Sequence, residues 1–378
     1  MQNRVYTNVY SNISFSVLSP HSLLHDARVS LKASRVYPLH DWVKQQVVEY
    51  FIRYLDVSKA RVIVLEDEDD YCTIPYKTRF HSVDSILRNF NEVFDLASRS
   101  NREGVWLVIT TNPAKFERMD YLSYRYEFMR SWNRALAWFR KKFKRVSYIA
   151  VFEFTDSGLL HIHVIFFGLK RIEDAYKFMK RLEDWGFGRV HYMVSVVNEN
   201  GVWRPKVLSK YYHKIDNCDG AGLPKDFLLA SRMGLKNYLK KYLTKTLKAM
   251  EKINSILNSS SGTLDFITGV FQTVSKSGIS QSGAESTKNG VVRPATSTIN
   301  IAAALWKLAF YWALRLRFFT YSRDLGVVSR KRIRLLRYRF VGVFSIEHYV
   351  VYNGYYHDWL ENPDFLCFDV VSITEALF

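Results

Sequence analysis

The chain has 378 residues, enough for two or three domains with a sizeable hydrophobic core. Its 54 Lys and Arg against 36 Asp and Glu give a formal charge of +18, and 16% of the residues are aromatic. Cationic surfaces bind phosphates by counterion release, and aromatic rings stack on unpaired bases, so this composition favours nucleic acid as the partner. The alternative is an unusually basic soluble protein.

Several classes of protein are disfavoured by local sequence. The three cysteines form no CxxC pair and lie too far apart for a zinc finger or a disulfide framework: Cys72, Cys218 and Cys367. Residues 1–21 lack the basic start and continuous apolar core of a signal peptide. The most apolar window, 301–319, is interrupted by Lys307, Arg315 and Arg317. We therefore expect a buried helix there, in a soluble, cytoplasmic protein with no membrane partner.

Residues 1–100 are predicted to form an N-terminal accessory α/β region. The pattern indicates a helix over 39–55, a strand over 61–67 and a second amphipathic helix over 83–97. None of these segments contains a recognisable catalytic or binding motif.

Residues 101–250 show a more regular alternation of strands and helices. The expected elements are a strand at 105–111, a basic aromatic helix at 119–145, strands at 146–154 and 159–168, a helix at 171–186 and a strand at 188–197. This β-α-β-β-α-β order predicts an α+β fold, a ferredoxin-like split βαβ with a central antiparallel sheet. RNA-recognition domains have the same arrangement. We expect the helices on one face of the sheet and a ligand on the other, free face.

The remainder of the chain is less regular. A polar insertion at 199–230 precedes a predicted helix at 231–250, and a Ser/Gly-rich linker or long loop follows at 251–298. A basic C-terminal region is expected at 299–378, with a strongly basic run at 329–340 and strand-like pieces at 340–352 and 365–373.

Two histidines and a carboxylate form the first candidate site. His161 and His163 are two residues apart on a predicted strand, so they share one face of the sheet. If residues 155–158 turn a hairpin, Glu153 faces His161 across the two strands. Two imidazoles, one carboxylate and open positions suit a catalytic divalent metal. The alternative is a pair of tolerated histidines; His191 is a spare fourth candidate, and Asp156 is expected only to occupy the turn.

The helix at 231–250 carries the second candidate site. Leucines recur every fourth residue and form its buried stripe: Leu235, Leu239, Leu243 and Leu247. Tyr238 and Tyr242 are one turn apart on one flank, and Lys241 and Lys245 follow them in two successive YxxK patterns. Tyr and Lys also line the boundary of many amphipathic helices. The functional interpretation makes each tyrosine a nucleophile, helped by a neighbouring ammonium.

Three ordered motifs in residues 105–250 resemble those of the HUH endonucleases, and among them the rolling-circle replication initiators of archaeal plasmids and viruses. They are "WLVITTNP", "FEFTDSGLLHIHVIFFG" and "YLKKYLTK". The resemblance implies that His161 and His163 bind Mg²⁺ or Mn²⁺ with Glu153 as the third ligand. It also implies the two-tyrosine subclass, with Tyr238 and Tyr242 accompanied by Lys241 and Lys245.

The resemblance implies a function as well as a site. The expected reaction is site-specific nicking and joining of single-stranded DNA at a replication origin through a 5′-phosphotyrosine. The chain has no GxxxxGK[ST] phosphate loop, so a separate host helicase and replication machinery are implied. The alternatives are an HUH transposase or relaxase, or a non-catalytic nucleic-acid-binding module like the RNA-recognition domains, which would expose aromatic rings on its central strands.

DNA contacts are expected from two basic segments, the helix at 120–145 and the run at 329–340. The residues chosen are Arg125, Arg130, Arg134, Lys141, Lys142, Arg330, Lys331 and Arg332. Such charges also occur on a merely solvated face.

Overall fold

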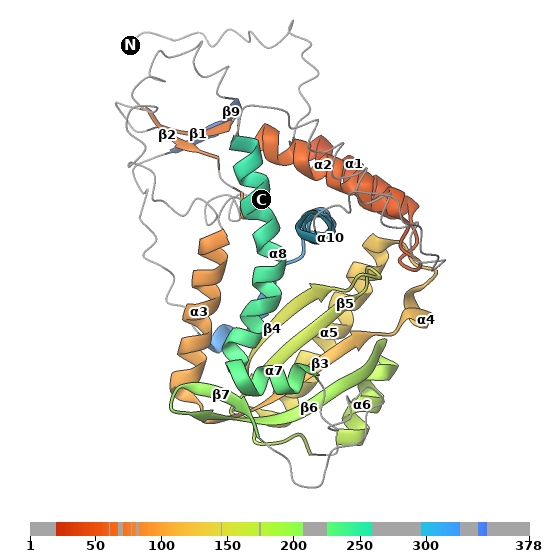
Figure 1. Cartoon of the computed structure of the whole chain (residues 1–378), viewed down its shortest axis with the longest axis vertical. Helices are drawn as coiled ribbons and strands as arrows, with labels where there is room; N and C mark the ends of the chain where they lie inside the picture. Colours follow the sequence, from red (N-terminus) through yellow and green to blue (C-terminus); the bar gives the residue numbers. More distant parts are fainter. Residues whose placement is uncertain are drawn as a thin grey trace, which may run out of the picture.

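The computed structural model describes residues 20–59, 61–66, 71–76, 78–80, 83–144, 146–173, 175–206, 225–258, 296–325 and 339–345. Its centre is a six-stranded antiparallel sheet of order β7-β6-β3-β5-β4-β8 (Figure 1). The strands are β3 (Glu103–Thr111), β4 (Ser147–Phe154), β5 (Leu160–Phe167), β6 (Phe187–Glu199), β7 (Val202–Pro205) and β8 (Phe319–Tyr321).

The predicted α+β fold is confirmed. Helix α5 (Tyr121–Phe143) follows β3, and α6 (Ala175–Asp184) lies between β5 and β6, which gives the β-α-β-β-α-β order. Within the sheet the four strands of this unit lie in the order β6-β3-β5-β4, with antiparallel neighbours. This is the ferredoxin-like arrangement expected from the sequence.

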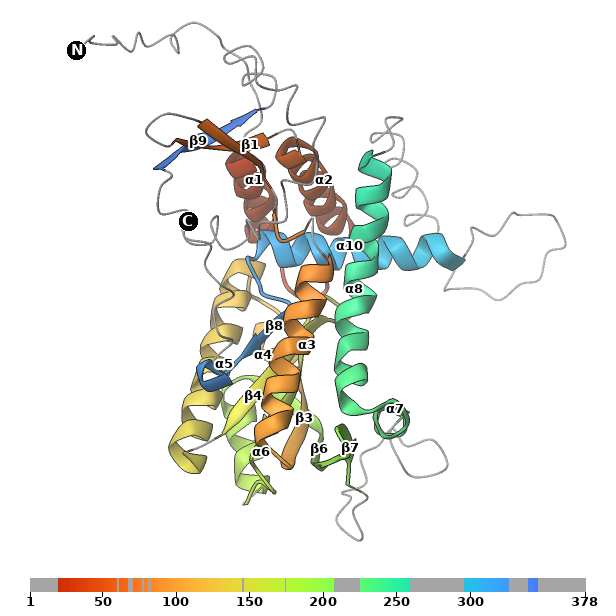
Figure 2. The same cartoon turned by 90° about the vertical axis from the view of Figure 1, so that its left-hand side faces the viewer.

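Helices cover both faces of this sheet, so the expectation of one free face is wrong. On one face α5 packs against the even-numbered residues of β4 and β5, as in the stack of Phe139 on Phe166 at 3.9 Å. On the other face lie α3 (Val83–Ser100) and α8 (Leu235–Asn258), and Tyr238 packs edge-on against Trp106 of β3 at 4.9 Å (Figure 2). The leucine stripe of α8 is buried as predicted, and this packing explains why the second face is covered.

The apolar window forms helix α10 (Thr296–Ala313), which crosses one end of the sheet and lies against α8 and α2. Phe310 is fully buried and packs against Phe154 of β4, which confirms the expected buried helix. Arg315 follows the helix with a positive φ of 50°, and its N–H donates to the carbonyl of Trp312. None of the described helices is long and apolar enough to cross a membrane.

The N-terminal part adds a helical pair and a second sheet. Helix α2 (Asp41–Lys59) corresponds to the predicted helix, whereas α1 (Pro20–Ala33), which packs beside it, was not predicted. A three-stranded sheet has the order β2-β1-β9, with β1 at Arg61–Glu66, β2 at Tyr71–Pro75 and β9 at Arg339–Ser345. Because β8 and β9 join different sheets, the chain after 299 contributes to both parts of the structure.

The helix expected at 231–250 is divided at Gly234, which has φ +79°. Helix α7 (Lys225–Met233) ends there and α8 begins at the next residue. A Cβ on Gly234 would lie 2.9 Å from the side chain of Val202, so both the backbone and the space require glycine. Helix α8 continues to Asn258; the rest of the predicted linker, up to α10, and the strand-like piece at 365–373 lie outside the described residues.

Candidate functional site

The β4–β5 hairpin brings the first candidate residues together. Glu153 is the register partner of His161, and His163 pairs with Val151, so the three polar side chains share a face of the sheet. At the turn, the Thr155 N–H donates to the Leu159 carbonyl at 2.8 Å. Gly158 has φ +85° and lies against the Tyr121 hydroxyl, where a Cβ would not fit. The hairpin expected from the sequence is therefore present.

Glu153 and His163 are in direct contact. Oε2 of Glu153 lies 3.3 Å from Nε2 of His163, and the exposed side-chain fractions are 14% and 4%. Burial alone would raise the pKa of Glu153, but the hydrogen bond and charge of His163, with the charges of Lys245 and Lys307, lower it below its ordinary value. Glu153 is therefore an ionised carboxylate in a largely buried site at neutral pH.

Helix α8 places both candidate tyrosines over this pair. The ring of Tyr242 stacks on the imidazole of His163, with centroids 4.0 Å apart and planes at 23°. The hydroxyl oxygens of Tyr238 and Tyr242 are 2.6 Å apart. The two tyrosines differ in access, because Tyr238 is completely buried against Trp106 whereas Tyr242 is half-buried.

The predicted lysines also lie at this site. Nζ of Lys245 is 3.8 Å from Oε1 of Glu153, with 61% of the lysine side chain exposed. Nζ of Lys241 is 5.7 Å from the ring centroid of Tyr242. Lys245 thus connects the carboxylate to solvent, and Lys241 places a cation beside the more accessible tyrosine.

Lys307 was not predicted to belong to the site. Although it is only 5% exposed, its Nζ lies 2.8 Å from the Asp156 carboxylate at the hairpin turn. This hydrogen bond lowers the pKa of Asp156. The sequence contained one signal for this role, a lysine in the middle of the most apolar window. A buried ammonium needs a partner, but nothing local identified Asp156 as that partner.

Two of the three expected metal ligands have suitable spacing. Adjacent ligands of an octahedral cation with bonds of about 2.1 Å are roughly 3 Å apart, close to the 3.3 Å between Glu153 Oε2 and His163 Nε2. His161 is on the same face, across from Glu153. Within the described residues no group of three or more His, Cys, Asp and Glu is arranged to hold a metal ion. The donor types fit a divalent cation, and two of them are close enough to share it.

The expected DNA-contact residues of α5 lie on the sheet face opposite α8 (Figure 2). Arg130 is exposed and pairs with Glu127 at 3.3 Å, whereas Arg125 is half-buried. Arg134, Lys141 and Lys142 are exposed. Three further expected contacts, Arg330, Lys331 and Arg332, lie outside the described residues, as does the side chain of His191.

Comparison with known families gives a match over part of the chain. Residues 106–216 match the model of a family described as replication-associated protein ORF2. The matched segment contains Glu153, His161 and His163 and ends before α8, so it does not include the tyrosines. Comparison with curated proteins and with solved structures gives no match. The family match indicates a replication-associated protein of the Rep type, for which DNA is the expected partner.

Proposed function

We propose that this protein is a rolling-circle replication initiator that nicks and rejoins single-stranded DNA through a 5′-phosphotyrosine. The main support is the position of the Tyr238 and Tyr242 hydroxyls, 2.6 Å apart, over the His163–Glu153 pair. Nucleophile, carboxylate and imidazole from separate segments lie on one sheet face, as a phosphoryl-transfer site requires. The match to a replication-associated family favours an initiator over a transposase or relaxase, which would use the same residues on other DNA.

The more accessible Tyr242 is the first nucleophile in this proposal. Its oxygen attacks the scissile phosphorus, the bond from phosphorus to the 3′ oxygen breaks, and that oxygen takes up a proton and leaves as a 3′-hydroxyl. The phenolic proton of Tyr242 is released. Tyr238 is buried and positions Tyr242 through their hydrogen bond. A second strand transfer by Tyr238, as in the two-tyrosine subclass, requires its hydroxyl to be uncovered first.

Glu153 and His163, joined by His161, would hold the divalent ion, Mg²⁺ or Mn²⁺. The ion, when bound, supplies Lewis-acid polarisation of the scissile phosphate. The chain's own contribution is to keep Glu153 ionised and to hold the His163 ring against Tyr242. Because the 378 residues contain no GxxxxGK[ST] loop, duplex unwinding falls to a separate host helicase.

A non-catalytic module of the RNA-recognition type is disfavoured by the packing of α8. Such modules stack bases on exposed aromatic side chains of the central strands. Here Trp106 of the central strand β3 is fully buried beneath Tyr238, and the polar residues of β5 lie under Tyr242. The face that would receive the bases is therefore occupied by the chain itself.

The test is a covalent adduct with single-stranded DNA. A pool of random-sequence oligonucleotides, labelled at the 3′ end, is incubated with the protein and Mn²⁺ and analysed on a denaturing gel. The proposal predicts a labelled protein band that the double variant Tyr238→Phe/Tyr242→Phe does not form. Tyr126→Phe, an exposed tyrosine of α5, is the matched control. An adduct retained by the double variant, or no adduct with any pool including strands of the protein's own replicon, would refute the mechanism.

A further inference from the structure

A basic hollow lies between α1, the start of α5 and the residues after α10. It has a volume of about 380 Å³, and the described residues that line it include Arg28, Lys32 and Arg315 but no Asp or Glu. His21 and His25 lie at the same surface. Three cations drawn from separate segments thus surround one cavity, and none of the described lining residues is acidic and able to neutralise them.

Arg125 adds a fourth cation beside the hollow. Its Nε atom is buried and has no hydrogen-bond partner among the described residues. Burial, together with the positive charges of Arg28 and Arg315, lowers the pKa of Arg125, so these three guanidinium groups are close enough to repel one another. Arg315 adopts its positive φ of 50° at this place, a backbone conformation that disfavours side chains other than glycine.

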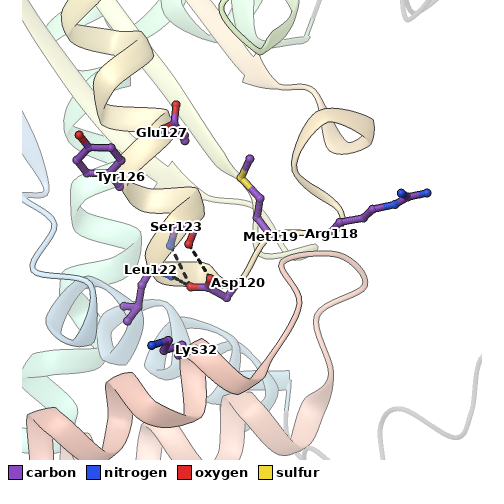
Figure 3. Close-up of a pocket in the computed structure, with 8 residues that line it drawn as sticks. All are labelled: Lys32, Arg118, Met119, Asp120, Leu122, Ser123, Tyr126 and Glu127. Carbon is purple, nitrogen blue, oxygen red and sulfur yellow. Dashed lines mark hydrogen bonds between the residues drawn. The ribbon is translucent and has the colours of Figure 1, made fainter.

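An adjoining hollow shares Lys32 and Leu122 with the first and is shown in Figure 3. It contains two carboxylates, but both are engaged. Asp120 caps α5 by accepting hydrogen bonds from the Leu122 and Ser123 N–H groups, and Glu127 pairs with Arg130. Tyr126, which is 61% exposed, lies on the wall of this hollow and provides a ring on which a base can stack.

We propose that the hollow of Arg28, Lys32, Arg125 and Arg315 binds backbone phosphates of the DNA strand at a distance from the tyrosines. Mutually repelling arginines are stabilised by an anion, and guanidinium groups match phosphate geometry. Helix α10 links the two places, because Lys307 lies at the hairpin turn and Arg315 about two helical turns further along the chain. The choice of DNA as the anion rests on the proposed function.

The binding measurement is made in the Tyr242→Phe background, so that the result does not depend on nicking. Labelled single-stranded DNA of mixed sequence is titrated with protein, and fluorescence anisotropy is recorded over a series of salt concentrations. Arg28→Ala should weaken binding several-fold and reduce the slope of log K against log [salt] by about 0.7 for each phosphate that the protein no longer binds. Arg28→Lys should keep most of the slope, because the charge remains.

The control is Arg53→Ala on α2, an exposed arginine whose charge is already paired with Glu49 at 2.5 Å. It should leave affinity and slope unchanged. The melting temperature of Arg28→Ala without DNA should be unchanged or higher, because a repulsive charge is removed. Unchanged affinity and slope in Arg28→Ala, or a loss of affinity matched by a lower melting temperature, would overturn the proposal. An absence of covalent adduct alone would contradict only the nicking mechanism.

Discussion

Tyr238→Phe and Tyr242→Phe should have unequal effects on covalent adduct formation. Tyr242→Phe removes the attacking oxygen, so no adduct should form in the first cleavage. Tyr238→Phe removes only the partner of the 2.6 Å hydrogen bond that orients Tyr242. A hydrogen bond between neutral hydroxyls contributes about 1 kcal/mol, which corresponds to roughly a fivefold slower cleavage. The complete burial of Tyr238 is the reason for expecting this asymmetry.

The assay follows the rate of adduct formation on denaturing gels for the two variants and for the Tyr126→Phe control. Digestion of the wild-type adduct and mass spectrometry of the DNA-linked peptide then identify the attacking residue, which should be Tyr242. Equal rates for the two variants would contradict the argument from burial. A DNA-linked peptide carrying the modification on Tyr238 would contradict it as well, because that hydroxyl would have been reached first.

The remaining predictions concern the carboxylates and the packing of β3. Glu153→Gln should reduce Mn²⁺-dependent adduct formation at least about tenfold while leaving DNA affinity equal or higher, because one anionic ligand is lost; equal adduct rates would exclude Glu153 from the site. Asp156→Ala should lower the free energy of unfolding by about 1 kcal/mol, because it leaves the buried Lys307 ammonium without its exposed partner. Since the folded-state pKa of Asp156 is depressed, this contribution is present above about pH 4 and is lost as the pH falls through the folded-state value, which urea unfolding at several pH values can verify. Gly104→Ala should destabilise by about 1–3 kcal/mol, because its Cβ would lie 2.7 Å from the Phe166 carbonyl; a cost near zero in thermal unfolding would show that the strands adjust freely.

The order of elements and the shared face of the two histidines followed from local periodicity. Strands alternate every two residues and helices repeat every 3.6, so the buried stripe of α8 and the placement of His161 beside His163 could be inferred from spacing. The division of the helix at Gly234 was missed because glycine is tolerated within a helix unless its φ becomes positive. Helix α1 was missed because no motif or strong periodicity marked residues 20–33.

Other features depend on which segments meet in space. Lys307 meets Asp156 across 151 residues of chain, and Arg28, Arg125 and Arg315 come from three separate segments. No periodicity encodes such meetings, because they arise from the packing of α10 over the end of the sheet. Tyr238 and Tyr242 look equivalent in the repeated YxxK pattern, yet α8 turns one hydroxyl into the core against Trp106 and leaves the other more accessible. Spacing therefore identified the candidate groups, whereas burial distinguished the attacking tyrosine from its supporting neighbour.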